Sequence, residues 1–207
     1  MDIEDFLELV KNRRHNGRLR TDPVPDELLE KILTAAGWAP SGNNSQPWEF
    51  IVVKSQETRA KIREILEGSA RPTPSPTSPA DPPVIIVVCG DRRLKESFPE
   101  GVNREEVFHS SLAAATQNLH LAAASLGLAT TWGTARKNTM ELLRGLLNLP
   151  EELEIVALVR AGYPQEIPPP RPRRPVSEAI HQEKFDRTRL RDVQMFIQTY
   201  GRGWGRL

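Results

Sequence analysis

The chain has 207 residues, of which 38% are hydrophobic and 27% are charged, and its formal net charge is +1. This composition is typical of a globular protein, and a charge near zero argues against a broad electrostatic surface for nucleic acid or an anionic membrane. The longest uninterrupted apolar run, residues 84–89, is too short to cross a bilayer, and the acidic first residues lack the apolar core of a signal peptide. A single cysteine allows no intrachain disulfide, and we expect a cytoplasmic protein.

Hydrophobic periodicity and turn-forming residues divide the chain into helices and strands. In the first half they predict a helix at 3–12, a basic segment at 13–18, a helix that begins at 25–27, a polar loop at 40–48, a strand at 49–53 and a charged surface helix at 56–67. In the second half they predict a buried strand at 84–89, a long helix at 104–127, a strand or extended turn at 128–134, a helix at 138–148, a strand at 155–161 and a last helix at 186–199. Because strands and helices are mixed, the expected class is α/β or α+β, with helices packed on a sheet.

The helix at 104–127 carries the strongest apolar stripe of the chain, and Gly127 is expected to end it. Alanines at 113–115 and 122–124 give it a second surface of small side chains. One interpretation is a core helix of a single subunit. The other is a central helix that packs closely against a second subunit.

Two segments are rich in proline. Residues 69–83 hold six of the 18 prolines, and residues 164–175 hold six more, interspersed with arginines. The first segment is predicted to be a loop or a lid and is too short to mark a domain boundary. We therefore predict a single domain over residues 1–207, with a proline-rich loop at 69–83 and a C-terminal extension at 186–207.

The polar loop at 40–48 is the most informative stretch of the sequence. Five amide and hydroxyl side chains lie between Pro40 and Pro47, namely Ser41, Asn43, Asn44, Ser45 and Gln46. Water could satisfy them. A flat heteroaromatic ligand could do so as well, because amides donate and accept hydrogen bonds and so match a ring edge such as the flavin pyrimidine.

Several kinds of catalytic site lack their sequence signal. The four histidines are far apart in the sequence and have no metal-ligand spacing, and we find no GxSxG, P-loop or GxGxxG motif. Cys89, inside an apolar run, is expected to be a buried hydrophobic residue. Trp38 is expected in the core, and His109, His120 and His181 are expected on helix surfaces or in packing.

Two basic clusters remain, Arg13-Arg14-His15 and a second around Arg171, Arg173 and Arg174. They could be solvated surface charge. They could also converge on one phosphate group, because guanidinium groups bind phosphate oxygens through paired hydrogen bonds. Together with the polar loop, a phosphate site would suit a phosphorylated flavin.

With these motifs in order, the chain resembles the FMN-dependent nitroreductase family over roughly residues 5–185. The family pattern RRSxRxF is similar to residues 13–19, followed by Pro23-Val24-Pro25. The pattern PSxxNxQPW is present in full at Pro40, Ser41, Asn44, Gln46, Pro47 and Trp48, and it is the most specific of these matches. The pattern LGLGTxW is similar to residues 126–132, and the late GYP with a basic segment is similar to residues 162–164 and 171–175.

The resemblance implies an α+β, nitroreductase-like fold: a central, mainly antiparallel sheet flanked by helices, in a homodimer with two FMN sites at its interface. It implies that Arg13, Arg14, His15, Arg171 and Arg173 bind the phosphate and ribityl end of FMN. It also implies that Pro40, Ser41, Asn44 and Gln46, from the same or the partner subunit, contact the flavin, and that Trp132, Gly133 and Thr134 line its ring system.

Two departures from the family pattern concern the basic segment. The family's serine is His15, which can still donate to phosphate. The family's second cation, expected near flavin N1 and O2, falls on Gly17. Arg18, one residue later, could replace it; otherwise the flavin potential should be lower and hydride acceptance slower.

The function that the resemblance implies is hydride transfer from NAD(P)H, through FMN, to an electron-poor small molecule such as a nitroaromatic, a quinone or an enone, by a ping-pong mechanism. No metal and no catalytic acid–base pair are expected. The alternatives are another flavin reaction on this fold (oxygen-dependent dehydrogenation, reductive dehalogenation or flavin cleavage), a non-catalytic FMN- or phosphate-binding protein, and a scaffold that has lost its cofactor.

Overall fold

The structure is a computed structural model that describes residues 2–68, 82–134 and 137–200. The chain divides into two compact units, Met1–Pro168 and Pro169–Leu207. Most of the predicted lid at 69–83 and the end of the C-terminal extension lie outside the described residues. The first unit carries the sheet and most of the predicted site.

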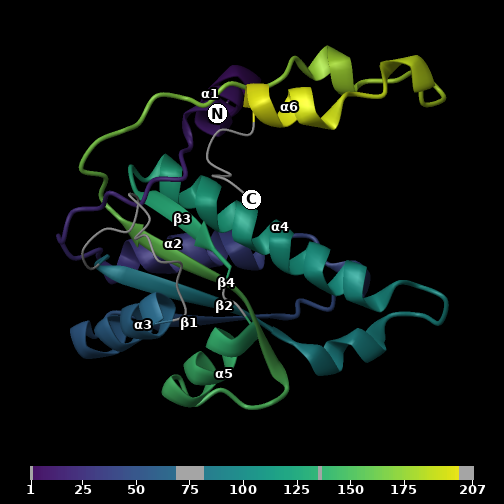
Figure 1. Cartoon of the computed structure of the whole chain (residues 1–207). Helices are drawn as coiled ribbons and strands as arrows, with labels where there is room; N and C mark the ends of the chain where they lie inside the picture. The colour runs from purple at the N-terminus through teal and green to yellow at the C-terminus, as the bar shows by residue number, and fades with distance from the viewer. Residues whose placement is uncertain (1, 69–81, 135–136, 201–207) are drawn as a thin grey trace. The chain divides into compact units, whose positions relative to one another are not determined.

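The first unit follows the predicted order of elements (Figure 1). Its helices are α1 (Ile3–Asn12), α2 (Asp26–Gly37), α3 (Gln56–Gly68), α4 (Arg104–Ser125) and α5 (Lys137–Leu146). Its strands are β1 (Trp48–Val53), β2 (Val84–Asp91), β3 (Ala129–Gly133) and β4 (Leu153–Gly162). The four strands form one sheet in the order β1-β2-β4-β3, and every pair is antiparallel. The predicted antiparallel sheet flanked by helices is therefore confirmed.

The central strand β2 is buried on both faces, as its unbroken apolar run predicts. Alternate side chains point to opposite faces of the sheet. Ile86 and Val88 pack on the face covered by α2 and α4, whereas Val87 and Cys89 pack on the face covered by α3 and α5 (Figure 1). Burial raises the pKa of the Cys89 thiol to about 12, so this residue is a packing group, as expected.

Helix α4 is the main core helix of the first unit. Phe108, Leu112 and Leu119 are fully buried against the sheet. Gly90 in β2 lets the helix approach closely, because a Cβ there would lie 2.4 Å from the Phe108 ring and 2.5 Å from Leu112. The helix ends at Ser125, and Gly127, two residues later, has the φ of +75° that allows the chain to turn there, as expected.

The prediction that Trp38 lies in the core is wrong, because its side chain is 84% exposed. The buried face of α2 is formed by Leu29, Ile32 and Ala36, and the helix ends at Gly37. Trp38 follows the last turn of the helix and does not belong to this buried face. Helix α1 forms as predicted, but none of its residues is buried; Ile3, for example, is 65% exposed.

The second unit contains α6 (Val193–Tyr200) and two short 3₁₀ turns, at Val176–Ala179 and Arg187–Arg189. The helix predicted at 186–199 is therefore interrupted. The side chains of Asp186 and Asp192 explain the break: Asp186 accepts from Thr188 N–H at 3.0 Å and Asp192 accepts from Met195 N–H at 3.0 Å, so each caps a separate start.

Candidate flavin site

The basic segment that follows α1 is attached to the outer edge of β3. His15 and Thr130 form an isolated parallel bridge, and Asn16 N–H donates to the Thr130 carbonyl oxygen at 3.1 Å. Trp132 N–H donates to His15 Nδ1 at 3.3 Å. Because Nδ1 accepts this bond, a neutral His15 carries its proton on Nε2. The structure thus brings together the predicted phosphate-binding segment and the strand predicted to line the ring.

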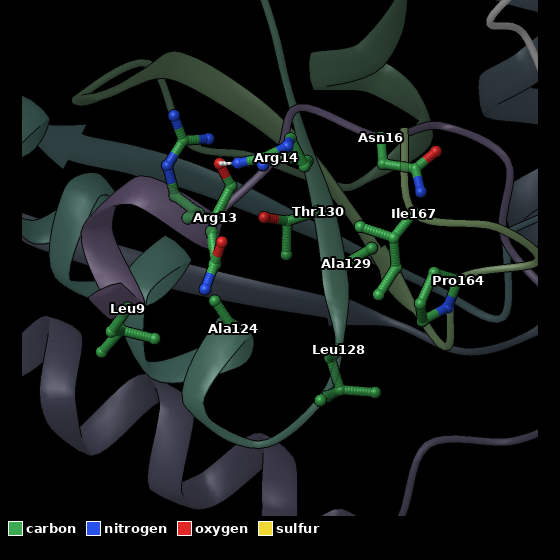
Figure 2. A pocket seen from close by; sticks show the side chains of 12 residues that line it. Leu9, Arg13, Arg14, Asn16, Ala124, Leu128, Ala129, Thr130, Pro164 and Ile167 are labelled. Atoms are coloured by element: carbon green, nitrogen blue, oxygen red, sulfur yellow. Dashed lines mark hydrogen bonds between the residues drawn. The ribbon is translucent and has the colours of Figure 1, made fainter. Parts of the chain in front are cut away.

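A cavity of about 170 Å³ lies beside this attachment (Figure 2). The side chains of Leu9, Ala124, Leu128 and Ile167 contribute its apolar wall. The polar lining includes Arg13, Arg14, Asn16 and Thr130. Cationic and amide groups over an apolar wall suit a ligand that has an anionic end.

Arg14 is held by the backbone. Its Nε donates to the Pro168 carbonyl at 3.0 Å, and its Nη1 donates to the carbonyls of Lys11 and of Arg13. Since a guanidinium has five N–H groups, the Nη2 donors remain for a ligand. Arg14 therefore fixes the end of α1 to residue 168, and its predicted contact with phosphate stays a prediction.

Gly17 is buried, and the neighbouring Arg18 forms an ion pair with Glu166. Asn16 fixes this turn, because its side chain accepts from Arg18 N–H at 3.0 Å and donates to the Glu166 carbonyl at 2.6 Å. The Arg18 side chain is 55% exposed, so the pair is solvated and contributes about 1 kcal/mol or less. Arg18 could replace the cation missing at Gly17 only if its side chain left its ion pair with Glu166.

The polar loop has an unusual backbone. Asn43, Asn44 and Gln46 have φ values of +50°, +52° and +45°. Asparagine tolerates this left-handed region, but a long side chain such as that of Gln46 rarely adopts it. Backbone strain of this kind persists where the surrounding structure imposes it, and it is concentrated at functional sites.

The neighbouring elements hold the loop in this shape. Gly42 N–H donates to Ser111 Oγ at 3.2 Å, and Asn43 Nδ2 donates to the Ser97 carbonyl at 2.7 Å. Inside the loop, Gln46 N–H donates to Ser41 Oγ at 3.0 Å. The exposed side chain of Asn44 has no hydrogen-bond partner among the described residues, and is therefore available to a ligand.

The two halves of the predicted site lie along different parts of α4. The loop contacts Ser111, whereas the cavity beside the basic segment is lined by Ala124. These positions are about 20 Å apart along the helix axis at a rise of about 1.5 Å per residue. The structure therefore does not bring the loop and the basic segment of one chain together.

The remaining predicted residues are divided between the two units. Trp132 is half-buried at the end of β3 and Thr134 is exposed just beyond it. Arg171 and Arg173 belong to the second unit, and their convergence on the site stays a prediction. Among the described residues, no group of three acidic, histidine or cysteine side chains could hold a metal ion.

His120 is a residue whose position the sequence did not predict. It is 3% exposed, its Nδ1 lies 2.6 Å from Thr130 Oγ1, and its ring lies 5.6 Å from the Trp132 ring at an angle of 30°. Burial, and then the basic groups Arg13 and His15, lower its pKa to about 4. The expected packing role is compatible with this burial, but the contact with two residues of β3 could not be read from the spacing of one helix.

Comparisons with known proteins identify the family of the chain. The model of the Nitroreductase family matches residues 10–163. A protein of Archaeoglobus fulgidus with the provisional name NADH dehydrogenase/NAD(P)H nitroreductase is 35% identical over 167 residues, which cover 79% of this chain and 88% of the relative. The iodotyrosine deiodinase of Nematostella vectensis is 26% identical over 180 residues, covering 77% of this chain and 67% of the relative.

The fold also matches a solved structure. A provisionally named nitroreductase from Desulfovibrio desulfuricans, determined in complex with FMN, superimposes with a TM-score of 0.70 at 29% identity, covering 87% of this chain and 97% of the other. No helix in the described part of the chain has both the length and the apolarity that a membrane crossing requires. From the match over residues 10–163 and the shared fold, the chain belongs to the nitroreductase family.

Proposed function

We propose that the protein is an FMN-dependent oxidoreductase that uses NAD(P)H to reduce an electron-poor small molecule. The observation that carries this proposal is the attachment of the basic segment to β3 through Thr130 and Trp132. It joins the segment predicted to bind phosphate to the strand predicted to line the ring system. When bound, FMN supplies a ring nitrogen, N5, that accepts a hydride from the nicotinamide and passes it on. The relative from Archaeoglobus and the FMN-bound structure support the choice of cofactor and reductant.

The residues present fit this cofactor. Arg13 and the Nε2–H of His15 would bind the phosphate, and the arginines at 171 and 173 would add to this site if they converge on it. Trp132 and Gly133 would lie along the ring system. These side chains only bind and position the cofactor, and none of them is required to transfer a proton.

We infer that the working site requires two copies of the chain. The loop and the basic segment contact parts of α4 about 20 Å apart, so a loop from a partner would complete the site of its neighbour. The exposed apolar side of α1 and the exposed Trp38 offer surface that a second copy would cover. A symmetric dimer would then hold two sites, each built from both chains.

The acceptor and the nicotinamide would use the same exposed flavin face in turn, which is the basis of the ping-pong mechanism. Nitroaromatics, quinones and enones are the expected acceptors. The resemblance to iodotyrosine deiodinase favours one alternative, reductive dehalogenation, on the same fold. A cytoplasmic location stays a prediction from the sequence.

The test begins with the purified full-length chain. A bound flavin spectrum, followed by bleaching on anaerobic addition of NADH or NADPH, is expected, and a nitroaromatic or a quinone should restore the oxidised spectrum. Restoration only by a halogenated aromatic would favour the dehalogenation alternative. Bound FMN that neither nicotinamide reduces would instead indicate a non-catalytic flavin-binding protein and would contradict the proposal.

A further inference from the structure

The buried pair His120–Thr130 joins α4 to β3 beside the cavity. Thr130 lines the cavity but is only 2% exposed, and Figure 2 shows its hydroxyl oxygen on the side that faces Arg13. His120 lies behind it, with Nδ1 at 2.6 Å from this oxygen. On the other side of the ring, Nε2 is buried and has no hydrogen-bond partner in the described part of the chain.

The unpartnered Nε2 indicates where the proton of His120 resides. A neutral imidazole carries one proton, on either Nδ1 or Nε2. A proton on Nε2 would create a buried N–H without an acceptor, and such groups are rare in folded proteins. The favourable tautomer therefore has the proton on Nδ1, so that His120 donates to Thr130 Oγ1.

The charges around the ring agree with a neutral His120. The charged groups that act on it are Arg13 and His15, both on the segment attached to β3. Strand β3 itself contributes the uncharged Thr130 and Trp132. Burial and the two basic groups both disfavour a second proton and hold the pKa of His120 at about 4.

A threonine hydroxyl that accepts from His120 still has its own hydrogen to donate. Thr130 Oγ1 has no other hydrogen-bond partner among the described residues. The remaining direction open to this hydrogen is the cavity, which Arg13, Arg14 and Asn16 also line. An anionic oxygen held there would receive a charge-assisted hydrogen bond.

We propose that Thr130 binds the ligand by donating its hydroxyl hydrogen to an anionic oxygen beside Arg13, and that His120 is the positioning residue that orients this hydroxyl. The inference rests on the proposed FMN site, and the phosphate monoester of FMN is the expected anion. His120 itself does not touch the ligand. His120 donates its Nδ1–H to Thr130 Oγ1, so the hydroxyl hydrogen of Thr130 is left for the ligand.

The first test uses the full-length wild-type protein labelled with ¹⁵N-histidine. The expected spectrum has His120 protonated on Nδ1 and bare on Nε2 at neutral pH. The signal is assigned with His120→Gln or, if that variant does not fold, by replacing the other three histidines one at a time. A proton on Nε2 would overturn the proposal, because the Thr130 hydroxyl would then be donated to His120.

The second test compares the affinities of FMN and riboflavin, which lacks the phosphate, for the flavin-free protein. Thr130→Val should weaken FMN binding by about 10- to 100-fold, the range for a hydrogen bond to a charged group, and leave riboflavin binding nearly unchanged. Thr131→Val is the matched control. Thr131 is equally buried on the same strand, but it accepts from Arg160 Nε on the opposite face, so its loss should not change FMN affinity.

A double-mutant cycle separates positioning from packing. His120→Leu and Thr130→Val alone each leave a buried partner without its hydrogen bond, so each should lower Tm. The double variant removes both groups and should recover Tm, but its FMN affinity should stay as low as that of Thr130→Val. Recovery of FMN affinity together with Tm would overturn the proposal.

Further outcomes keep this inference distinct from the proposed function. Thr130→Ser retains the hydroxyl and should retain FMN affinity within about threefold. Equal losses of FMN and riboflavin binding in Thr130→Val would overturn the inference alone. Wild-type protein that binds no FMN would overturn the inference and the proposed function together.

Discussion

At the scale of the residue, Thr130 connects three parts of the first unit. Its carbonyl accepts from Asn16, its hydroxyl contacts His120, and its side chain lines the cavity. A substitution at any of these partners is therefore expected to alter the proposed phosphate site. None of these contacts could be predicted from the spacing of residues in the sequence, because they depend on how α4 and the basic segment pack against β3.

The neutral state of His120 makes stability depend on pH. Its pKa is lowered from 6.5 to about 4, so between these values the unfolded chain binds more protons than the folded one. Folding stability should therefore rise as pH increases from about 4 to 6.5, by about 3 kcal/mol from this residue. The free energy of unfolding of the flavin-free protein, measured by urea denaturation across this range, checks the slope.

The control for this pH dependence is His120→Leu, which has no titratable group at this position. Its free energy of unfolding should change less with pH, and the difference between the two slopes isolates His120. Equal slopes in wild type and variant would show that His120 does not stay neutral in the folded protein.

Gly42 provides a residue-scale test of the loop anchor. A Cβ at this position would lie 2.2 Å from Val107 Cγ1 and 3.0 Å from the Phe98 ring. Gly42→Ala should lower the free energy of unfolding by about 1–3 kcal/mol through overpacking, and should weaken FMN binding because the loop is displaced. Thermal unfolding and flavin fluorescence measure the two effects.

A glycine in open space gives the matched control for Gly42. Gly145 lies inside α5, and a Cβ there would meet nothing within 4 Å. Gly145→Ala should raise the free energy of unfolding by about 0.5–1 kcal/mol and leave FMN affinity unchanged. Similar effects of the two substitutions would contradict the proposed tight contact at Gly42.

At the scale of the element, hydrophobic periodicity predicted the helices and strands of the first unit to within a few residues. It succeeded where a segment buries one face, as α4 does, or both faces, as β2 does. It also predicted α1, although no residue of that helix is buried. It failed where burial stops, at Trp38 beyond the end of α2. It also failed in the second unit, where local aspartate caps divide one predicted helix.

The residue types of the loop at 40–48 identified it in the sequence, but they did not predict its backbone conformation. Gln46 has a φ of +45°, which is strained for a residue with a Cβ. Gln46→Gly should relieve this strain and raise the free energy of unfolding by about 1 kcal/mol, while FMN affinity falls because the amide is lost. Urea denaturation and FMN titration of the same samples measure both quantities.

Asn148 is the matched control for this loop substitution. Its φ is +51°, and it lies between α5 and β4 rather than in the loop. Asn148→Gly should be neutral or stabilising and should not change FMN affinity. If Gln46→Gly binds FMN as tightly as Asn148→Gly does, the Gln46 side chain does not contact the flavin.

At the scale of the whole molecule, the resemblance predicted the family, which the comparisons confirm, whereas the residues that it assigns to the two halves of the site stay a prediction. The separation of these halves along α4 needed the structure, because it depends on which turn of the helix each segment contacts. This separation distinguishes two arrangements. Either the loop of one chain serves the basic segment of a partner, or each segment acts without the other.

Mixing two defective variants tests the first arrangement. The loop variant carries Asn44→Ala and Gln46→Ala, and the segment variant carries Arg13→Ala and His15→Ala. Each variant alone should bind FMN weakly. After the two are unfolded and refolded together, half of the dimers should be mixed, and each mixed dimer should contain one intact site, so about one quarter of the wild-type sites should return.

The count of recovered sites decides between the two arrangements. If each segment acted without the other, the loop variant alone would still bind FMN through its intact basic segment, and mixing the two variants would restore no further sites. Refolding each variant alone gives the baseline, and analytical ultracentrifugation of the mixture establishes that dimers have formed. Recovery near one quarter would show that each flavin site needs residues from both copies, and dimers without recovery would contradict this arrangement.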